Sequence, residues 1–165
     1  MKRTKHIALA AMLSFAFATG FSQSKPDNET LKVSLTENQK RNTMNSFISI
    51  FEIPATDISR AITFYQAILG IQIEKLDMPE MQMGIFPYED QAVTGVIIKA
   101  EGYLPSADGV TIYLNGGNNL QTILDKVEEN GGKVIVPKTP HADDSGYFAL
   151  FHDSEGNKMG LHSIN

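Results

Sequence analysis

One order of predicted elements occurs twice along the chain, and this repeat limits the fold more than any other feature of the sequence. A strand over 46–54 is followed by an amphipathic helix with apolar positions from Ile58 to Leu69, and then by three short strands. The same order starts again at Val110, a spacing of roughly sixty residues that suggests an internal duplication. One such unit leaves an apolar sheet face uncovered and cannot close alone, so the two units are expected to fold together.

Turn residues and apolar spacing place the remaining elements. The other strands are predicted over 71–76, 81–86, 92–99, 110–115, 133–137, 147–152 and 157–162. A second helix is predicted over 120–127 by apolar residues at three- and four-residue steps, and it ends at Gly131. The predicted fold class is therefore α+β, with two tandem βαβββ modules (46–100 and 109–163) in a single domain over 46–163. Together the modules are expected to form a curved sheet that encloses a cleft.

The first twenty residues have the order of a secretory signal peptide. Three lysine and arginine residues precede an apolar run over 7–18, and small residues follow it. The alternative is a membrane anchor, but a spanning helix needs ~20 apolar residues and this run is shorter. We expect a signal peptide at 1–20 and a flexible linker at 21–45. The domain is then periplasmic or secreted, with no membrane contact after cleavage.

Composition narrows the possible functions. The chain has no cysteine, which excludes disulfides, thiolate metal sites and a cysteine nucleophile. Nineteen acidic residues against 14 basic ones give a net charge of −5, whereas nucleic-acid binders usually have a basic surplus. Neither a glycine-rich phosphate loop nor a serine-hydrolase motif is present. We therefore expect a small-molecule partner and no nucleic acid.

Two ordered sets of short segments carry a family resemblance. They read FEIPATD at 51–57, RA at 60–61, FY at 64–65 and LG at 69–70, then YLN at 113–115, VE at 127–128, GGKV at 131–134, DSEGNK at 153–158 and GLHS at 160–163. Over about residues 46–163, this order resembles the vicinal oxygen chelate superfamily, which includes glyoxalase I, bleomycin-resistance proteins and extradiol dioxygenases. The end of the chain is similar to the glyoxalase-related, largely uncharacterised branch. The resemblance also implies a possible homodimer.

The resemblance implies metal ligands at positions where this chain lacks them. Superfamily members that use a metal place His or Glu on the first and last strands of each module. Carried over to this sequence, those positions fall on Ile50, near Gly95 or Ile97, near Thr111 and on Gly160. None of these side chains is a good ligand for a divalent ion. We therefore predict no resident metal and no other cofactor.

Polar residues share the strand faces of these positions, because successive side chains of a strand point to opposite faces. Glu52 and His162 are the candidate catalytic acid and base, since a carboxylate in an apolar cleft and an imidazole can exchange protons near neutral pH. Tyr113, Asn115 and His152 are the candidate substrate-binding residues. The structural alternative is that Glu52 pairs with a backbone or basic group and that His162 lies at a wet end of the sheet.

Two functions follow from these residues. The first is an exported domain that binds a small molecule in its cleft without a metal, as bleomycin-resistance proteins do by resemblance. The alternative is a lyase or isomerase related to lactoylglutathione lyase, which acts on a small oxygenated metabolite through Glu52 and His162 or through an atypical metal.

Three further interpretations concern residues outside these two functions. The loop residue His141 either reaches over the cleft or is simply solvated. Met81 and Met83 either line the cleft or fill the core. Asp153 and Glu155 are interpreted as solvated acids.

Overall fold

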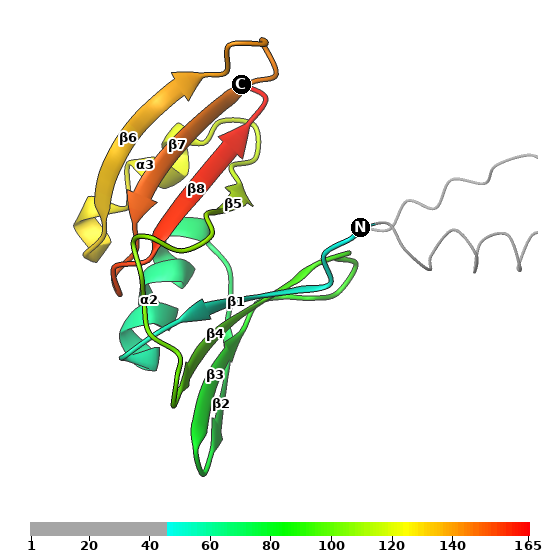
Figure 1. Cartoon of the computed structure of the whole chain (residues 1–165). Helices are drawn as coiled ribbons and strands as arrows, with labels where there is room; N and C mark the ends of the chain where they lie inside the picture. The colour runs from blue at the N-terminus through cyan, green and yellow to red at the C-terminus, as the bar shows by residue number, and fades with distance from the viewer. Residues whose placement is uncertain (1–45) are drawn as a thin grey trace, which may run out of the picture. The chain divides into compact units, whose positions relative to one another are not determined.

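The computed structural model describes residues 46–165 of the chain, in two modules with the same order of elements (Figure 1). The predicted signal peptide (1–20) and linker (21–45) lie outside the described residues. The first module contains β1 (Ile50–Pro54), α2 (Ile58–Leu69), β2 (Glu74–Met78), β3 (Met81–Ile85) and β4 (Thr94–Ala100). The second contains β5 (Ile112–Asn115), α3 (Gln121–Leu124), the 3₁₀ helix η1 (Glu128–Asn130), β6 (Lys133–Pro140), β7 (Tyr147–His152) and β8 (Lys158–Ser163).

The two sheets have the same topology. Each has four strands, in the order β1-β4-β3-β2 in the first module and β5-β8-β7-β6 in the second. In each sheet the first strand runs parallel to the last, and the other neighbours are antiparallel. The predicted α+β class with two βαβββ modules is confirmed. Within the described range 46–165, no helix is long and apolar enough to span a membrane.

The residues at its two ends explain where the helix α2 begins and ends. Asp57 caps its first turn, with Oδ1 accepting hydrogen bonds from the backbone N–H groups of Ser59 at 3.0 Å and Arg60 at 3.1 Å. Gly70 ends it with φ 68°, a left-handed conformation that glycine adopts at low cost. The chain after the helix is held by Gln66, whose Oε1 accepts from the Ile73 N–H at 2.9 Å. The strand predicted from 71 therefore starts only at Glu74.

The second helix is shorter than predicted. Its apolar positions Leu120, Leu124 and Val127 are buried as expected, but α3 covers only one turn and continues as turns and η1. Backbone hydrogen bonds change to i→i+3 spacing at Lys126 and beyond. The Asn130 Nδ2 group donates to the Lys126 carbonyl at 2.8 Å, which competes with helical pairing. The pattern thus predicted the buried face correctly and the helix length wrongly.

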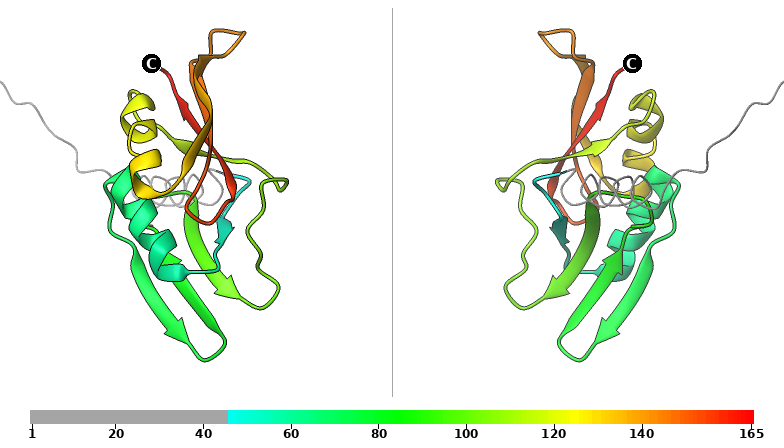
Figure 2. Two further views of the ribbon diagram at one scale, coloured as in Figure 1. Left: turned by 90° about the vertical axis from the view of Figure 1, so that its left-hand side faces the viewer. Right: turned by 90° about the vertical axis from the view of Figure 1, so that its right-hand side faces the viewer.

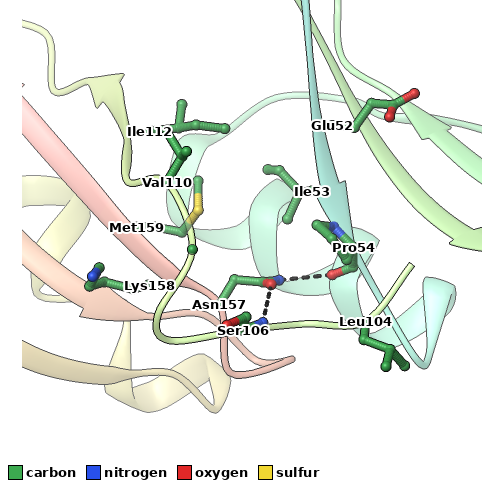
Figure 3. Close-up of a pocket in the computed structure, with 11 residues that line it drawn as sticks. Glu52, Ile53, Pro54, Leu104, Ser106, Val110, Ile112, Asn157, Lys158 and Met159 are labelled. Atoms are coloured by element: carbon green, nitrogen blue, oxygen red, sulfur yellow. Dashed lines mark hydrogen bonds between the residues drawn. The ribbon is translucent and has the colours of Figure 1, made fainter. Parts of the chain in front are cut away.

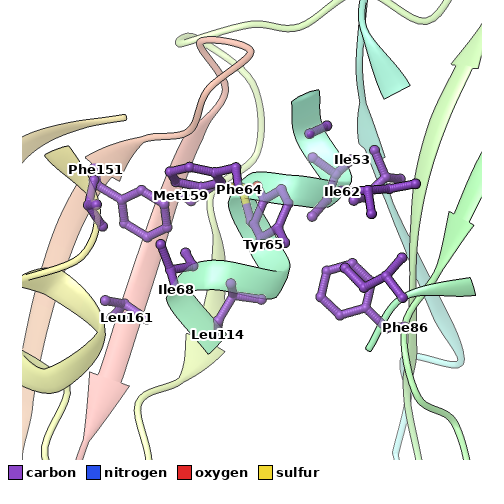
Figure 4. Packing of buried hydrophobic residues seen from close by; sticks show 14 of the residues in the cluster. Ile53, Ile62, Phe64, Tyr65, Ile68, Phe86, Leu114, Phe151, Met159 and Leu161 are labelled. Carbon is purple, nitrogen blue, oxygen red and sulfur yellow. The ribbon is translucent and has the colours of Figure 1, made fainter. Parts of the chain in front are cut away.

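The helix α2 packs on both sheets and forms the centre of the core (Figures 2 and 4). Phe64 lies 6.2 Å from Phe151 of the second sheet, measured between ring centroids. The Tyr65 ring lies 5.7 Å from the ring of Phe86, the residue directly after β3 of the first sheet, measured between centroids. A single helix therefore supplies apolar surface to both modules, which explains how two incomplete units close together.

The turn between β7 and β8 ties the second module to the start of α2. The Glu155 side chain is 0% exposed, and its carboxylate accepts from Arg60 Nε at 2.7 Å. It also accepts from the backbone N–H groups of Thr56 at 2.8 Å and Asp57 at 3.0 Å. An anion is favourable there, because these N–H groups have no partner inside the helix. The interpretation of Glu155 as a solvated acid is wrong.

Asp153 is also a structural acid. It is 3% exposed, and its carboxylate accepts from the Tyr65 hydroxyl at 2.7 Å and from the Asn157 N–H at 2.9 Å. Asn157 in turn donates to the Pro54 carbonyl at 2.8 Å and accepts from the Ser106 N–H at 3.1 Å (Figure 3). The 153–157 turn therefore binds β1, α2 and the inter-module loop, and the prediction of a solvated Asp153 is wrong.

Each sheet has a face packed against the helices and a face that points away from them. In the first sheet, Ile53, Ile97 and Gly84 pack toward α2. Because side chains alternate along each strand, the residues next to these three point to the opposite surface of the sheet. We call this surface the first open face. It comprises Ile50, Glu52, Glu74, Leu76, Met78, Met81, Met83, Ile85, Thr94, Val96, Ile98 and Ala100. Met81 and Met83 lie on this surface and outside the core cluster.

The second sheet shows the same division. Leu114, Phe151, Met159 and Leu161 are buried in the core cluster, so their strand neighbours point to the other surface. We call this surface the second open face. It comprises Tyr113, Asn115, Lys133, Val136, Thr139, Phe148, Leu150, His152, Lys158, Gly160 and His162.

Candidate functional site

Tyr113 and Gly160 form the centre of the candidate site on the second open face. They are paired across β5 and β8, and Tyr113 is 49% exposed. A Cβ atom placed on Gly160 would lie 2.5–2.7 Å from three carbon atoms of the Tyr113 ring. The ring therefore lies directly over the glycine, where no other residue would leave room for it. One exposed aromatic surface results at the position where the resemblance implies a metal ligand.

Asn115 and His162 lie side by side next to this ring. They are paired across β5 and β8, and with Tyr113 they line an open hollow of about 470 Å³. Asn115 Oδ1 accepts from the Gly117 N–H at 2.9 Å. This bond turns the Nδ2 donor of Asn115 away from the Gly117 turn. The hollow thus combines an aromatic surface with an amide donor and an imidazole.

Two residues outside the predicted set complete this surface. His141 lies 5.3 Å from His162 and 4.9 Å from Phe148, measured between ring centroids. The His141 N–H donates to the Gly146 carbonyl at 2.8 Å, which closes the hairpin between β6 and β7 and holds the loop over the sheet. Of the two interpretations of His141, the structure supports the one that places it over the open face. The position of Phe148 on this surface was not predictable from sequence, because both faces of its strand carry apolar residues.

Glu52 lies in a different place from His162. It lines a cavity of about 260 Å³ between the modules, together with Leu104, Val110, Ile112 and Met159 among others. In Figure 3 its carboxylate points away from the Val110 side of this cavity. Within residues 46–165, Glu52 and His162 therefore line two different hollows.

Tyr103 is the partner of Glu52, and sequence reasoning did not find it. The Glu52 carboxylate raises the pKa of Tyr103, because hydrogen bonding to the hydroxyl and the negative charge of Glu52 both favour the protonated form. The partner expected for Glu52 in a structural role was a backbone or basic group. A tyrosine from the loop after β4 carries no spacing signal, because the pair is 51 residues apart in sequence.

His152 shares the second open face but not the hollow. It is paired with Lys158 across β7 and β8 and with Lys133 across β6 and β7. His162 is four positions after Lys158 along β8, a distance of about 13 Å in an extended strand. His152 is therefore placed on the predicted surface, at the opposite end from the Asn115–His162 pair.

The positions that the resemblance assigns to a metal do not fit one. Ile50 points to the first open face, and the ring of Tyr113 covers Gly160. Gly95 and Ile97 point toward the core instead, because a Cβ on Gly95 would meet the Phe51 ring at 2.6 Å. Placing a ligand position at Gly95 or Ile97 was therefore wrong.

The other positions on the open faces are equally poor donors. The strand neighbours Val96 and Ile98 face the open side but offer no donor atom. Thr111 precedes β5 and offers only a hydroxyl. In residues 46–165, no three His, Asp or Glu side chains converge as a metal site would require.

Comparisons with known proteins agree with this architecture. The family model of the Glyoxalase/Bleomycin resistance protein/Dioxygenase superfamily matches residues 47–161. A glyoxylase-like domain-containing protein of Didymella fabae is 33% identical over an alignment 122 residues long, which covers 69% of this chain and 91% of that protein.

Solved structures share the fold. A glyoxalase I mutant from Zea mays aligns with a TM-score of 0.57 and 21% identity over 70% of this chain, which spans 46% of the maize chain. An antibiotic binding protein from a Streptomyces species aligns with a TM-score of 0.56 and 19% identity, over 73% of this chain and 97% of that one. The family model, the Didymella relative and the paired βαβββ modules lead to one conclusion: this chain belongs to the Glyoxalase/Bleomycin resistance protein/Dioxygenase superfamily.

Proposed function

We propose that this domain binds a small molecule on its second open face without a resident metal. The observation that carries the proposal is the Tyr113 ring over Gly160, which replaces a metal-ligand position by an aromatic surface. Asn115 and His162 stand beside the ring and supply polar groups that can fix a ligand's orientation. One protein with this fold is named as an antibiotic binding protein, which is consistent with a binding role.

The test is ligand capture by matched tyrosine variants. The purified protein is equilibrated with a metabolite extract, and bound compounds are identified by mass spectrometry. Tyr113→Ala should weaken binding of the captured compound about tenfold, because it removes the stacking surface. Tyr88→Ala is the control, since Tyr88 is similarly exposed at 58% but lies in the loop after β3. Equal affinity of the Tyr113→Ala variant and the native protein would refute the proposal.

The second candidate function is the acid–base lyase or isomerase. The neighbouring Tyr103 favours it, because its raised pKa keeps the hydroxyl protonated as a donor near the Glu52 carboxylate. His162 lies in another hollow of the same chain, so this reaction requires a second chain to bring His162 to Glu52. Turnover that survives in Glu52→Gln would eliminate this candidate.

We also propose that two copies of the chain pair through their first open faces. The first open face is mostly apolar and contains three methionines, Met78, Met81 and Met83, which adapt to varied partners. Its exposed apolar side chains include Ile50, Leu76 and Met78, which a second copy covers in this proposal. Pairing of this face with itself leaves the second open face accessible to a ligand.

Export is proposed from the N-terminal sequence, and one native mass spectrum tests it together with the pairing. Protein recovered from the producing cells should be about 2 kDa lighter than the 18.1 kDa chain, because the signal peptide has been removed. It should also have twice the mass of one processed chain. An unprocessed mass would contradict the export proposal, and a monomer at micromolar concentration would contradict the pairing.

A further inference from the structure

The two sheets of this acidic chain differ in charge. The chain has a net charge of −5, yet none of the four strands of the second sheet contains Asp or Glu. The second open face instead has two lysines and two histidines, which are Lys133, Lys158, His152 and His162. A positively charged surface on a negatively charged chain favours a ligand with negative charge.

The basic groups lie on both sides of the Tyr113 ring. Along β8, the residues on the open face before and after Gly160 are Lys158 and His162, each about 7 Å from the glycine in an extended strand. A planar group lying on the Tyr113 ring would thus have a cationic side chain or an imidazole at either end. This spacing fits a molecule of one or two fused rings.

Hydrogen-bond donors concentrate at the His162 end. Asn115 and His162 are paired on adjacent strands, and the bond from Gly117 to Asn115 Oδ1 leaves Nδ2 as the group of the amide that can donate to a ligand. Amide and imidazole N–H groups that are not matched by a carboxylate suit an oxyanion. The His141 ring beside His162 adds a third nitrogen-bearing group to this end of the site.

Asp143, one of the two acids in this hairpin, is directed to its own loop. Asp143 Oδ1 accepts from the Ser145 N–H at 3.1 Å, and the Ser145 hydroxyl and N–H lower the pKa of Asp143. Its carboxylate is therefore engaged within the 143–145 turn. The charge of His141 also lowers the pKa of Asp143, but less than the hydrogen bonds from Ser145 do. The open face between Tyr113 and His162 keeps its basic character.

We propose that the second open face selects a planar molecule with an oxyanion, such as a carboxylate or a phosphate. The ring system stacks on Tyr113, and the oxyanion accepts hydrogen bonds from Asn115 Nδ2 and His162, with Lys158 adding attraction from the other end. This inference rests on the proposed binding function and adds the chemical class of its ligand.

Matched probes test the class by titration calorimetry. The probes are 2-naphthoate, 2-naphthyl phosphate and the neutral 2-naphthamide. Both anions should bind at least about tenfold more tightly than the amide, because charge-assisted hydrogen bonds are stronger than neutral ones. Added salt should weaken the binding of both anions and leave the binding of the amide nearly unchanged. Tighter binding of only one anion would assign the site to carboxylates or to phosphates.

Charge-matched variants locate the effect. Lys158→Gln and Asn115→Ala should each weaken 2-naphthoate binding severalfold and leave 2-naphthamide binding unchanged. Lys126→Gln removes the same charge from the exposed segment after α3, and it should change neither probe. Equal losses in the Lys126→Gln and Lys158→Gln variants would overturn the proposal, because only net charge would then matter.

The outcomes separate this inference from the proposed function. If all three probes bind equally tightly and Tyr113→Ala weakens each of them, the binding function stands and the anion preference is overturned. If no probe binds at millimolar concentration, the anion site is overturned, and the binding function is decided by ligand capture from the extract.

Discussion

Replacing Asp153 by alanine should lower the free energy of unfolding by about 3–5 kcal/mol, because it leaves several buried donors without a partner. The Asp153 carboxylate accepts from the Tyr65 hydroxyl at 2.7 Å, from the Glu155 N–H at 2.9 Å and from the Asn157 N–H and Nδ2 at 2.9 Å each. Tyr65 is fully buried, so its hydroxyl has no access to water after the change. Urea unfolding followed by circular dichroism measures the loss.

Two variants control this prediction. Asp125→Ala removes an exposed carboxylate that accepts from Gln121 Nε2, and it should cost less than about 1 kcal/mol. Tyr65→Phe removes one donor and keeps the ring, so it should cost about 1–2 kcal/mol. Burial, followed by the charge of Asp153, raises the pKa of Tyr65, which keeps the hydroxyl protonated as a donor. A loss below 1 kcal/mol for Asp153→Ala would show that the 153–157 turn does not hold the modules together.

Replacing Glu155 by glutamine should destabilise the domain by about 2–4 kcal/mol at pH 7 and by much less at pH 3. Burial alone would raise the pKa of Glu155, but hydrogen bonds from Arg60, Asp57 and Thr56 outweigh it and lower the pKa below its ordinary value of 4.5. A lowered pKa in the folded state contributes stability that is present above pH 4.5 and lost as the pH falls through the folded value. Glutamine cannot supply this contribution at any pH.

Unfolding curves at a series of pH values measure this difference. The native protein should lose stability between pH 4.5 and pH 3, and the Glu155→Gln variant should lose less over the same interval. Glu129→Gln, an exposed change in η1, is the control and should follow the native curve. Parallel curves for the Glu155→Gln variant and the native protein would contradict the role assigned to the Glu155 carboxylate.

Strand alternation made much of the fold and the site predictable. Each module begins with a strand, at Ile50 and at Ile112, and the first strand is followed by the helical spacing after Ile58. These patterns were predictable because apolar residues recur at the spacing of the buried face. The same rule put Glu52 and His162 on strand faces away from the core, but it predicted one shared cleft, whereas the two residues line different hollows. Local capping by Asp57 followed the ordinary preference for acids at helix starts.

Long-range polar contacts were not predictable. Asp153 and Glu155 have the composition of a solvated turn, and their partners lie 88 to 99 residues away in the chain. The length of α3 depended on a local bond from Asn130 that competes with helical pairing. The faces of Gly95 and Ile97 depended on the parallel register of β1 and β4, which no spacing along the chain fixes.

The open faces link the fold to the proposed function. The core and the 153–157 turn hold two sheets on one central helix, and this leaves an apolar surface on one sheet and a basic, aromatic surface on the other. In the proposed function, small-molecule recognition on the second surface depends on Tyr113, Asn115 and His162 and uses no metal ion.

The metal and ligand content of the protein purified from its own cells tests this account most directly. Elemental analysis and mass spectrometry of the same sample should find a bound organic anion and far less than one transition-metal ion per chain. A stoichiometric transition metal, lost together with the ligand on chelation, would show that donors outside the Tyr113–His162 surface bind an ion and would contradict the account.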